Sequence, residues 1–131
     1  MTKHKYVEEF EIKASKKMLY PYLDTPGGLA QWFADDVTVN EDKVYNFLWE
    51  GDDHKARVIS HRTNHSIRFE FLPESPEDEE DPAYIEFKLD QNELTEAVFL
   101  RITDYTNEED EEELHHLWSN LVNNLKEIVG G

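Results

Sequence analysis

The sequence predicts an α+β fold, in which a curved antiparallel sheet of about seven strands wraps around one long C-terminal helix. Apolar residues recur every three or four positions between residues 107 and 129, as on one face of an amphipathic helix. Between residues 37 and 104, apolar and polar residues alternate in short runs, as in strands with one buried face. Short turns between these runs favour antiparallel pairing, and the long helix is large enough to cover the shared apolar face.

The first predicted strand runs from Tyr6 to Ala14 and places Tyr6, Phe10 and Ile12 on one face. Glu8 falls among these apolar positions. It indicates either an edge strand or a polar group inside a cavity, and we favour the edge.

Two short helices are predicted before the second strand. Ser15 is a typical N-cap for a helix over 16–23, and the segment 24–28 contains Pro26 and two glycines that end it. A second helix over 28–33 carries Trp32 and Phe33. We expect this helical pair to close one end of the curved sheet.

Six further strands are predicted in hairpin succession over 37–39, 43–50, 54–62, 66–72, 83–90 and 93–104. The turn signals between them include Gly51-Asp52-Asp53. The strand over 54–62 carries Ala56, Val58 and Ile59. The residues predicted to share one face of the other strands are Tyr45, Phe47, Trp49, Ile67, Phe69, Phe71, Ile85, Phe87, Leu89, Leu94, Val98, Leu100 and Ile102.

The segment 73–82 contains prolines and acidic residues and has no large apolar side chain. This composition predicts a mobile, solvated acidic loop between two strands. A partner-binding segment is the alternative that we favour less.

The C-terminal helix is expected over 107–129, capped by Thr106 or Asn107 and followed by Gly130. Its first turn is acidic, at residues 108–110, where free backbone N–H groups favour negative charge. Trp118 lies near its middle, so we predict that it packs on the sheet against Phe69, Phe87 or Val98.

The totals suit one ordinary domain over residues 1–131, with a net charge of −17 and no cysteine. Nucleic-acid binding is opposed because it needs basic groups, and anionic membranes are disfavoured for the same reason. Without cysteine there is no disulfide or thiolate chemistry. The N-terminus has no apolar signal segment, and no window approaches the ~18 apolar residues of a membrane span. We therefore expect a cytoplasmic protein that does not insert into membranes.

The stretch from Leu19 to Asp35 contains Thr25-Pro26, Leu29 and Trp32-Phe33, and it resembles a segment of the homologues of activators of the heat-shock-protein-90 ATPase. The later Phe47-Leu48-Trp49 and Trp118 are similar to the same pattern. This branch belongs to the START-like, birch-pollen-allergen-like (SRPBCC) superfamily, whose helix-grip fold has the element order predicted above. The resemblance implies that a hydrophobic small molecule binds between sheet and helix. Some members are enzymes and some assist chaperones, but no universal catalytic motif exists, so no catalytic residue is transferred.

The aromatic inner face is the candidate ligand site, because a sheet that grips a helix often stays open at one end. A fully packed core is the alternative interpretation of the same side chains. The predicted ligand-binding residues are Trp32, Phe33, Phe47, Trp49, Phe69, Phe71, Phe87, Trp118 and Leu121.

No metal site, cofactor or catalytic residue is predicted. His61 and His65 flank a predicted turn, and the adjacent His115 and His116 point about 100° apart on a helix. Acidic pairs are too frequent for any one pair to indicate acid–base chemistry. On the inner face we expect few polar groups, chiefly Glu8 and Tyr45.

Three functions follow from these features. The first is non-enzymatic binding of a small hydrophobic or amphipathic molecule. The second is a protein-interaction module that assists a chaperone through its acidic surface. The third, an enzyme acting on a ligand inside the cavity, is supported only by the existence of enzymes among the relatives.

Overall fold

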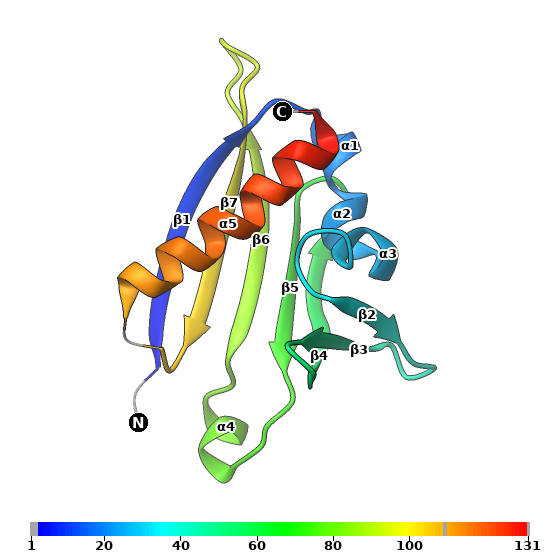
Figure 1. Cartoon of the computed structure of the whole chain (residues 1–131), viewed down its shortest axis with the longest axis vertical. Helices are drawn as coiled ribbons and strands as arrows, with labels where there is room; N and C mark the ends of the chain where they lie inside the picture. Colours follow the sequence, from blue (N-terminus) through cyan, green and yellow to red (C-terminus); the bar gives the residue numbers. More distant parts are fainter. Residues whose placement is uncertain (1–2, 109, 131) are drawn as a thin grey trace.

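In a computed structural model, which describes residues 3–108 and 110–130, a bent antiparallel sheet lies against one long helix (Figure 1). The strand order is β1-β7-β6-β5-β4-β3-β2, and helix α5 (Glu111–Val129) crosses the concave face. The strands are β1 (His4–Ile12), β2 (Asp36–Val39), β3 (Val44–Trp49), β4 (Asp52–Arg62), β5 (Ser66–Phe71), β6 (Tyr84–Gln91) and β7 (Val98–Thr106). The predicted α+β helix-grip architecture is confirmed.

The β3–β4 hairpin shows how local sequence sets the register. Trp49 pairs with Asp52, so the turn consists of Glu50 and Gly51, both with positive φ (51° and 87°). Two consecutive positive φ values are characteristic of the turn whose twist matches paired strands. The turn was therefore predicted between the right strands, but the predicted turn residues lie about one position too far along the chain.

Alternation correctly predicted most of the inner face, with one exception. Ile59 is 47% exposed, as alternation after the inward-facing Val58 requires, and the register of β4 against β5 shifts between Val58 and Ser60. The exception is Leu94, which is 95% exposed because β7 begins at Val98, four residues beyond it. The predicted strand over 93–104 thus began too early. Its first residues form a turn, in which the Asn92 side chain accepts hydrogen bonds from the backbone of residues 94 and 95.

Strand β1 lies at one edge of the sheet and pairs only with β7, which confirms the edge interpretation of Glu8. The Glu8 carboxylate accepts a hydrogen bond from the Tyr6 hydroxyl and lies 2.9 Å from Nδ1 of His115 on α5. Glu8 is therefore a polar contact between the edge strand and the helix.

Three one-turn helices replace the two predicted short ones: α1 (Lys16–Leu19), α2 (Pro21–Asp24) and α3 (Pro26–Leu29). Ser15 caps α1 as predicted, and Thr25 caps α3 by accepting a hydrogen bond from the Gly28 N–H. The predicted helix over 28–33 was wrong, because Pro26 starts a helix two residues earlier. The three helices lie beside one end of α5 (Figure 1).

Gly28 allows α3 to approach α2 closely, and we predict that Gly28→Ala lowers the free energy of unfolding by about 1–3 kcal/mol. A Cβ at this position would lie 2.1 Å from the carbonyl oxygen of Pro21, so the backbone must move. Gly27→Ala is the matched control, because a Cβ there meets nothing within 4 Å and alanine favours a helix. Urea unfolding measures both, and equal stability of the two variants would contradict the close approach.

Helix α5 begins at Glu111, later than predicted, because Asp110 and not Thr106 or Asn107 is its N-cap. The Asp110 carboxylate accepts from the N–H groups of residues 112 and 113, while Thr106 still belongs to β7. The predicted acidic first turn included Glu109, which lies outside the described residues. Gly130, with φ of 83°, ends the helix as expected.

The buried side of α5 consists of Leu114, Trp118, Val122 and Leu125. Trp118 is 1% exposed and contacts Phe87 edge-to-face, with ring centroids 6.1 Å apart. The predicted contact of Trp118 with the sheet is therefore confirmed at Phe87. Leu117, one position before it, remains 49% exposed.

The acidic segment 73–82 was predicted to be a loop, but part of it is helical. It contains helix α4 (Pro76–Glu80), with Ser75 as its N-cap and Pro76 at the first helical position. Figure 1 shows α4 near the N-terminal end of β1. Among the described residues, no helix combines the length and apolar character needed to cross a membrane.

Candidate functional site

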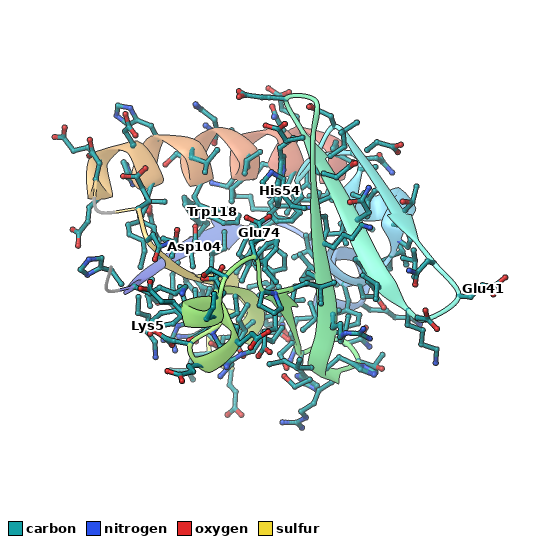
Figure 2. The ribbon with its side chains drawn as sticks, turned by 90° about the horizontal axis from the view of Figure 1, so that it is seen from below. Lys5, Glu41, His54, Glu74, Asp104 and Trp118 are labelled. Atoms are coloured by element: carbon teal, nitrogen blue, oxygen red, sulfur yellow. The ribbon has the colours of Figure 1, made fainter. Side chains whose placement is uncertain are left out.

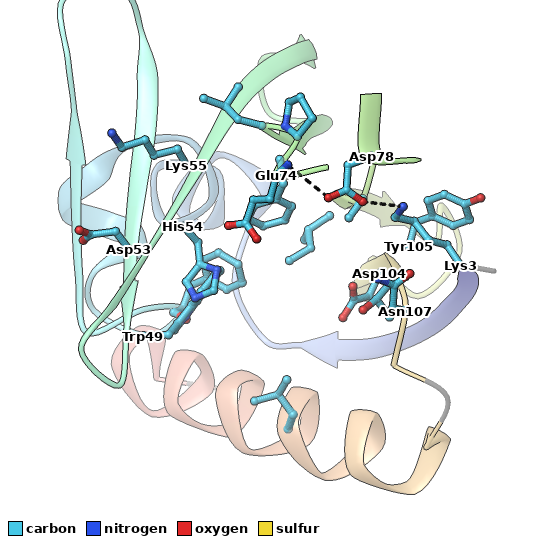
Figure 3. A pocket seen from close by; sticks show the side chains of 18 of the residues that line it. Lys3, Trp49, Asp53, His54, Lys55, Glu74, Asp78, Asp104, Tyr105 and Asn107 are labelled. Carbon is cyan, nitrogen blue, oxygen red and sulfur yellow. Dashed lines mark hydrogen bonds and ion pairs between the residues drawn. The ribbon is translucent and has the colours of Figure 1, made fainter. Parts of the chain in front are cut away.

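A cavity of about 720 Å³ lies between α5, the concave face of the sheet and the segment that carries α4 (Figure 3). Its volume is typical of sites for small organic molecules. Trp49 and His54 lie on one side of it, and Asp104, Asn107 and Lys3 lie on the other (Figure 3). The cavity therefore spans the sheet from the β3–β4 hairpin to β7.

The predicted ligand-binding residues separate into two groups. Five of them line the cavity, namely Phe33, Trp49, Phe71, Trp118 and Leu121. The other four, Trp32, Phe47, Phe69 and Phe87, are buried at 3% exposure or less and belong to the packed core, outside the lining. The interpretation as a ligand cavity therefore applies to the first group, and the interpretation as a packed core applies to the second.

Phe33 connects the packed core to the cavity wall. Its ring stacks on Trp118, with centroids 5.7 Å apart and planes 16° apart, and it meets Trp49 edge-on at 5.1 Å. Nε1 of Trp49 donates to the Phe33 carbonyl oxygen at 2.7 Å. The rings that face the cavity are therefore fixed by contacts behind them, which is the condition for a preformed site.

Asp104 is the residue of this site that the sequence interpretation missed. It continues the inward face of β7 after Leu100 and Ile102, lines the cavity, and is 8% exposed. Nε1 of Trp118 donates to its Oδ2 at 3.0 Å. Burial raises the pKa of Asp104 to about 6, and the Trp118 hydrogen bond acts against that rise. Its position in the alternation was the available signal, because the predicted strand extended to this residue.

The two polar groups that were predicted to face the cavity do not line it. Glu8 is bound to Tyr6 and His115, and the Tyr45 hydroxyl donates to the carbonyl oxygen of Asp24 at 2.6 Å. The prediction of few polar groups was also wrong, since carboxylates and His54 line the cavity. His54 packs against Trp49, with ring centroids 4.9 Å apart.

The α4 segment forms part of the cavity rim and is held by polar contacts. Nζ of Lys3, whose side chain is 4% exposed, lies 3.0 Å from Oδ1 of Asp78. The hydrogen bond from Lys3, with a second from the Glu74 N–H, holds the pKa of Asp78 below its usual range. The Tyr105 hydroxyl donates to the Asp81 carboxylate at 2.9 Å. These contacts join the acidic segment to Lys3, which precedes β1, and to β7, next to the cavity.

Within 3–108 and 110–130, no three histidine, aspartate or glutamate side chains are grouped as metal ligands.

The comparisons with known proteins agree with this architecture. The solution structure of the Aha1 dimer from Colwellia psychrerythraea has a TM-score of 0.75 at 22% identity, covering 96% of each chain. A Mesorhizobium loti protein has a TM-score of 0.74 at 14% identity, covering 97% of each chain. Both likenesses show the fold.

A Bacteroides fragilis protein, solved in solution, is 35% identical, with a TM-score of 0.64 over 98% of this chain and 92% of its own. No curated protein matches the sequence. The model of the START-like superfamily domain matches residues 1–131. Domains of this kind typically bind ligands or act with chaperones, and are generally non-catalytic. The chain therefore belongs to the START-like superfamily.

Proposed function

We propose that this protein binds a small hydrophobic or amphipathic molecule in the cavity between sheet and α5, without catalysing a reaction. The observation that carries the proposal is the cavity of about 720 Å³, whose lining includes Phe33, Trp49, Phe71 and Trp118 although other aromatic side chains of the same sheet are fully buried in the core. A domain of this size does not need unfilled apolar space to be stable. An apolar ligand would gain free energy by covering this wall.

The side chains around the cavity support binding rather than simple packing. Trp49, Phe71 and Leu121 are only partly buried, although each packs against the core. Leu117 also lines the cavity and is 49% exposed. Because these side chains belong to three different elements, a bound molecule would cover apolar surface on β3, β5 and α5 together.

Titration with 1-octanol or 2-naphthol should change the tryptophan fluorescence, because Trp49 and Trp118 line the cavity while Trp32 lies outside its lining. Calorimetry gives the stoichiometry, which we expect to be one molecule per chain. The absence of both heat and a fluorescence change across neutral, anionic and cationic probes would contradict the proposal.

A substitution that fills part of the cavity tests whether 1-octanol binds there. Ala83 lines the cavity and is partly buried, so Ala83→Phe should lower the affinity for 1-octanol about tenfold, ~1.4 kcal/mol. Ala97→Phe is the matched control, since Ala97 is equally partly buried but lies in the distant β6–β7 turn. Equal affinities of the two variants, measured by calorimetry, would place the bound molecule elsewhere.

A chaperone-assisting interaction is the second candidate, motivated by the branch resemblance and the net charge of −17. The contacts of Lys3 and Tyr105 hold the α4 segment in place, so exposed Glu79 and Glu80 form a fixed acidic surface. Binding to purified heat-shock protein 90 should weaken as salt rises and in the Glu79→Gln, Glu80→Gln variant. Unchanged binding in that variant would exclude this surface.

A further inference from the structure

The cavity lining includes a buried carboxylate, that of Asp104, whose hydrogen bonding is incomplete. The Asp104 residue is 8% exposed and lines the cavity, and its Oδ2 accepts from Trp118. Within the described part of the chain, neither an ion-pair partner nor a second hydrogen-bond donor reaches this carboxylate. A buried carboxylate normally has several donors. Oδ1 of Asp104 is therefore available to a ligand.

The nearest basic candidate in the lining is already paired. Lys3 lines the same side of the cavity as Asp104, but its Nζ binds Asp78 of the rim (Figure 3). The lining as a whole has two ammonium groups, Lys3 and Lys55, and five carboxylates, Glu50, Asp53, Glu74, Asp78 and Asp104. This excess of negative charge favours a cationic ligand and opposes a fatty-acid anion.

The rings of the cavity fit the apolar part of such a ligand. Trp118 donates to Asp104 from its N–H edge, and its ring is 1% exposed and stacked on Phe33, so it holds the carboxylate in place from behind. The partly buried rings of Trp49 and Phe71 also line the cavity and can cover hydrocarbon. Figure 2 shows Asp104 and Trp118 close together below α5, and Figure 3 shows His54 across the cavity from Asp104.

We propose that the cavity binds an organic ammonium ion, with its charged head against Asp104 and its apolar part along Trp49 and Phe71. This assignment rests on the proposed function, because it specifies the chemical class of the molecule that the cavity takes. The carboxylate attracts the ammonium charge in a space from which the bound ligand excludes water, and the aromatic wall covers the hydrocarbon part.

Three probes with the same octyl chain test the assignment: octyltrimethylammonium, 1-octanol and octanoate, each measured by calorimetry below its micelle concentration. We expect octyltrimethylammonium to bind about tenfold more tightly than 1-octanol, and octanoate to bind most weakly. Asp104→Asn should remove most of the preference for the cation and leave the affinity for 1-octanol within about twofold. The Asn side chain retains an oxygen that can accept from Trp118.

Asp90→Asn is the matched control, since Asp90 is an exposed carboxylate outside the lining and its substitution changes the net charge equally. It should keep the preference for the cation. Tight binding of octanoate by the unaltered protein, or cation binding in Asp104→Asn at the original affinity, overturns the assignment and leaves the cavity function intact. If none of the three probes binds, the proposed function falls and the ammonium assignment falls with it. The ranking of probes on the unaltered protein is decisive even if Asp104→Asn does not fold.

Discussion

Asp104→Asn is expected to raise the free energy of unfolding at pH 7 by up to about 3 kcal/mol. Burial raises the pKa of Asp104 from 3.8 to about 6 in the folded protein, so ionisation is less favourable there than in the unfolded chain. The folded state holds the proton over a pH range in which the unfolded state has released it. The native protein is therefore stabilised by this group at low pH and loses that contribution as pH rises from about 4 to about 6.

Asparagine cannot ionise, so the variant does not undergo this loss. Urea unfolding at pH 7 and pH 4 measures the effect, and the advantage of the variant should be largest at pH 7 and small at pH 4. The other polar groups in the region of Asp104 are those of Tyr6 on β1, Trp118 on α5 and Lys3. The Asp104→Asn substitution leaves all three unchanged. Asp90→Asn should show no such pH-dependent gain, because its carboxylate is exposed. If Asp104→Asn is less stable than the parent at pH 7, the substitution has costs that outweigh the gain from removing the unfavourable ionisation of Asp104.

The expected gain in stability accompanies an expected loss of cation binding. A buried carboxylate with a raised pKa destabilises the fold at neutral pH, and a cationic ligand would offset that cost when it binds. Groups of this kind are concentrated at functional sites. Opposite effects of one substitution on stability and binding would distinguish a ligand-binding role of Asp104 from a structural one.

The sequence was sufficient for the parts of this molecule that depend on local pattern. Alternation placed Phe47, Phe69 and Phe87 inside because the side chains of a strand change faces at every residue. It failed at Leu94, where a turn was taken for strand. This error arises because composition does not show where the pairing of a strand begins.

The cavity itself depends on contacts between distant residues. Lys3 meets Asp78 across 75 positions, and Trp118 meets Asp104 from a different element. No local pattern distinguishes these partners from the many other charged residues of an acidic chain. Which aromatic rings line the cavity also depends on the path of α5 over the sheet, so Phe33 and Trp49 could not be separated from Phe47 by spacing alone.

Trp118→Ala is expected to lower the free energy of unfolding by about 3–5 kcal/mol. Trp118 is 1% exposed, stacks on Phe33 and contacts Phe87, so its removal leaves a large space between α5 and the sheet. It also takes away the hydrogen bond from Nε1 to Asp104, leaving a buried carboxylate without that donor. The part of the indole that borders the existing cavity has fewer contacts to lose, which keeps the cost within this range.

Trp118→Phe separates the two contributions, because phenylalanine retains an aromatic ring and cannot donate to Asp104. Its cost should be smaller than that of Trp118→Ala and should be greater at pH 7 than at pH 4, because the lost hydrogen bond had opposed the raised pKa of Asp104. Urea unfolding of both variants at the two pH values, with octyltrimethylammonium titrations beside it, measures these effects. A Trp118→Ala variant that unfolds like the parent and still binds the cation would show that this face of α5 neither closes the core nor lines the ligand site.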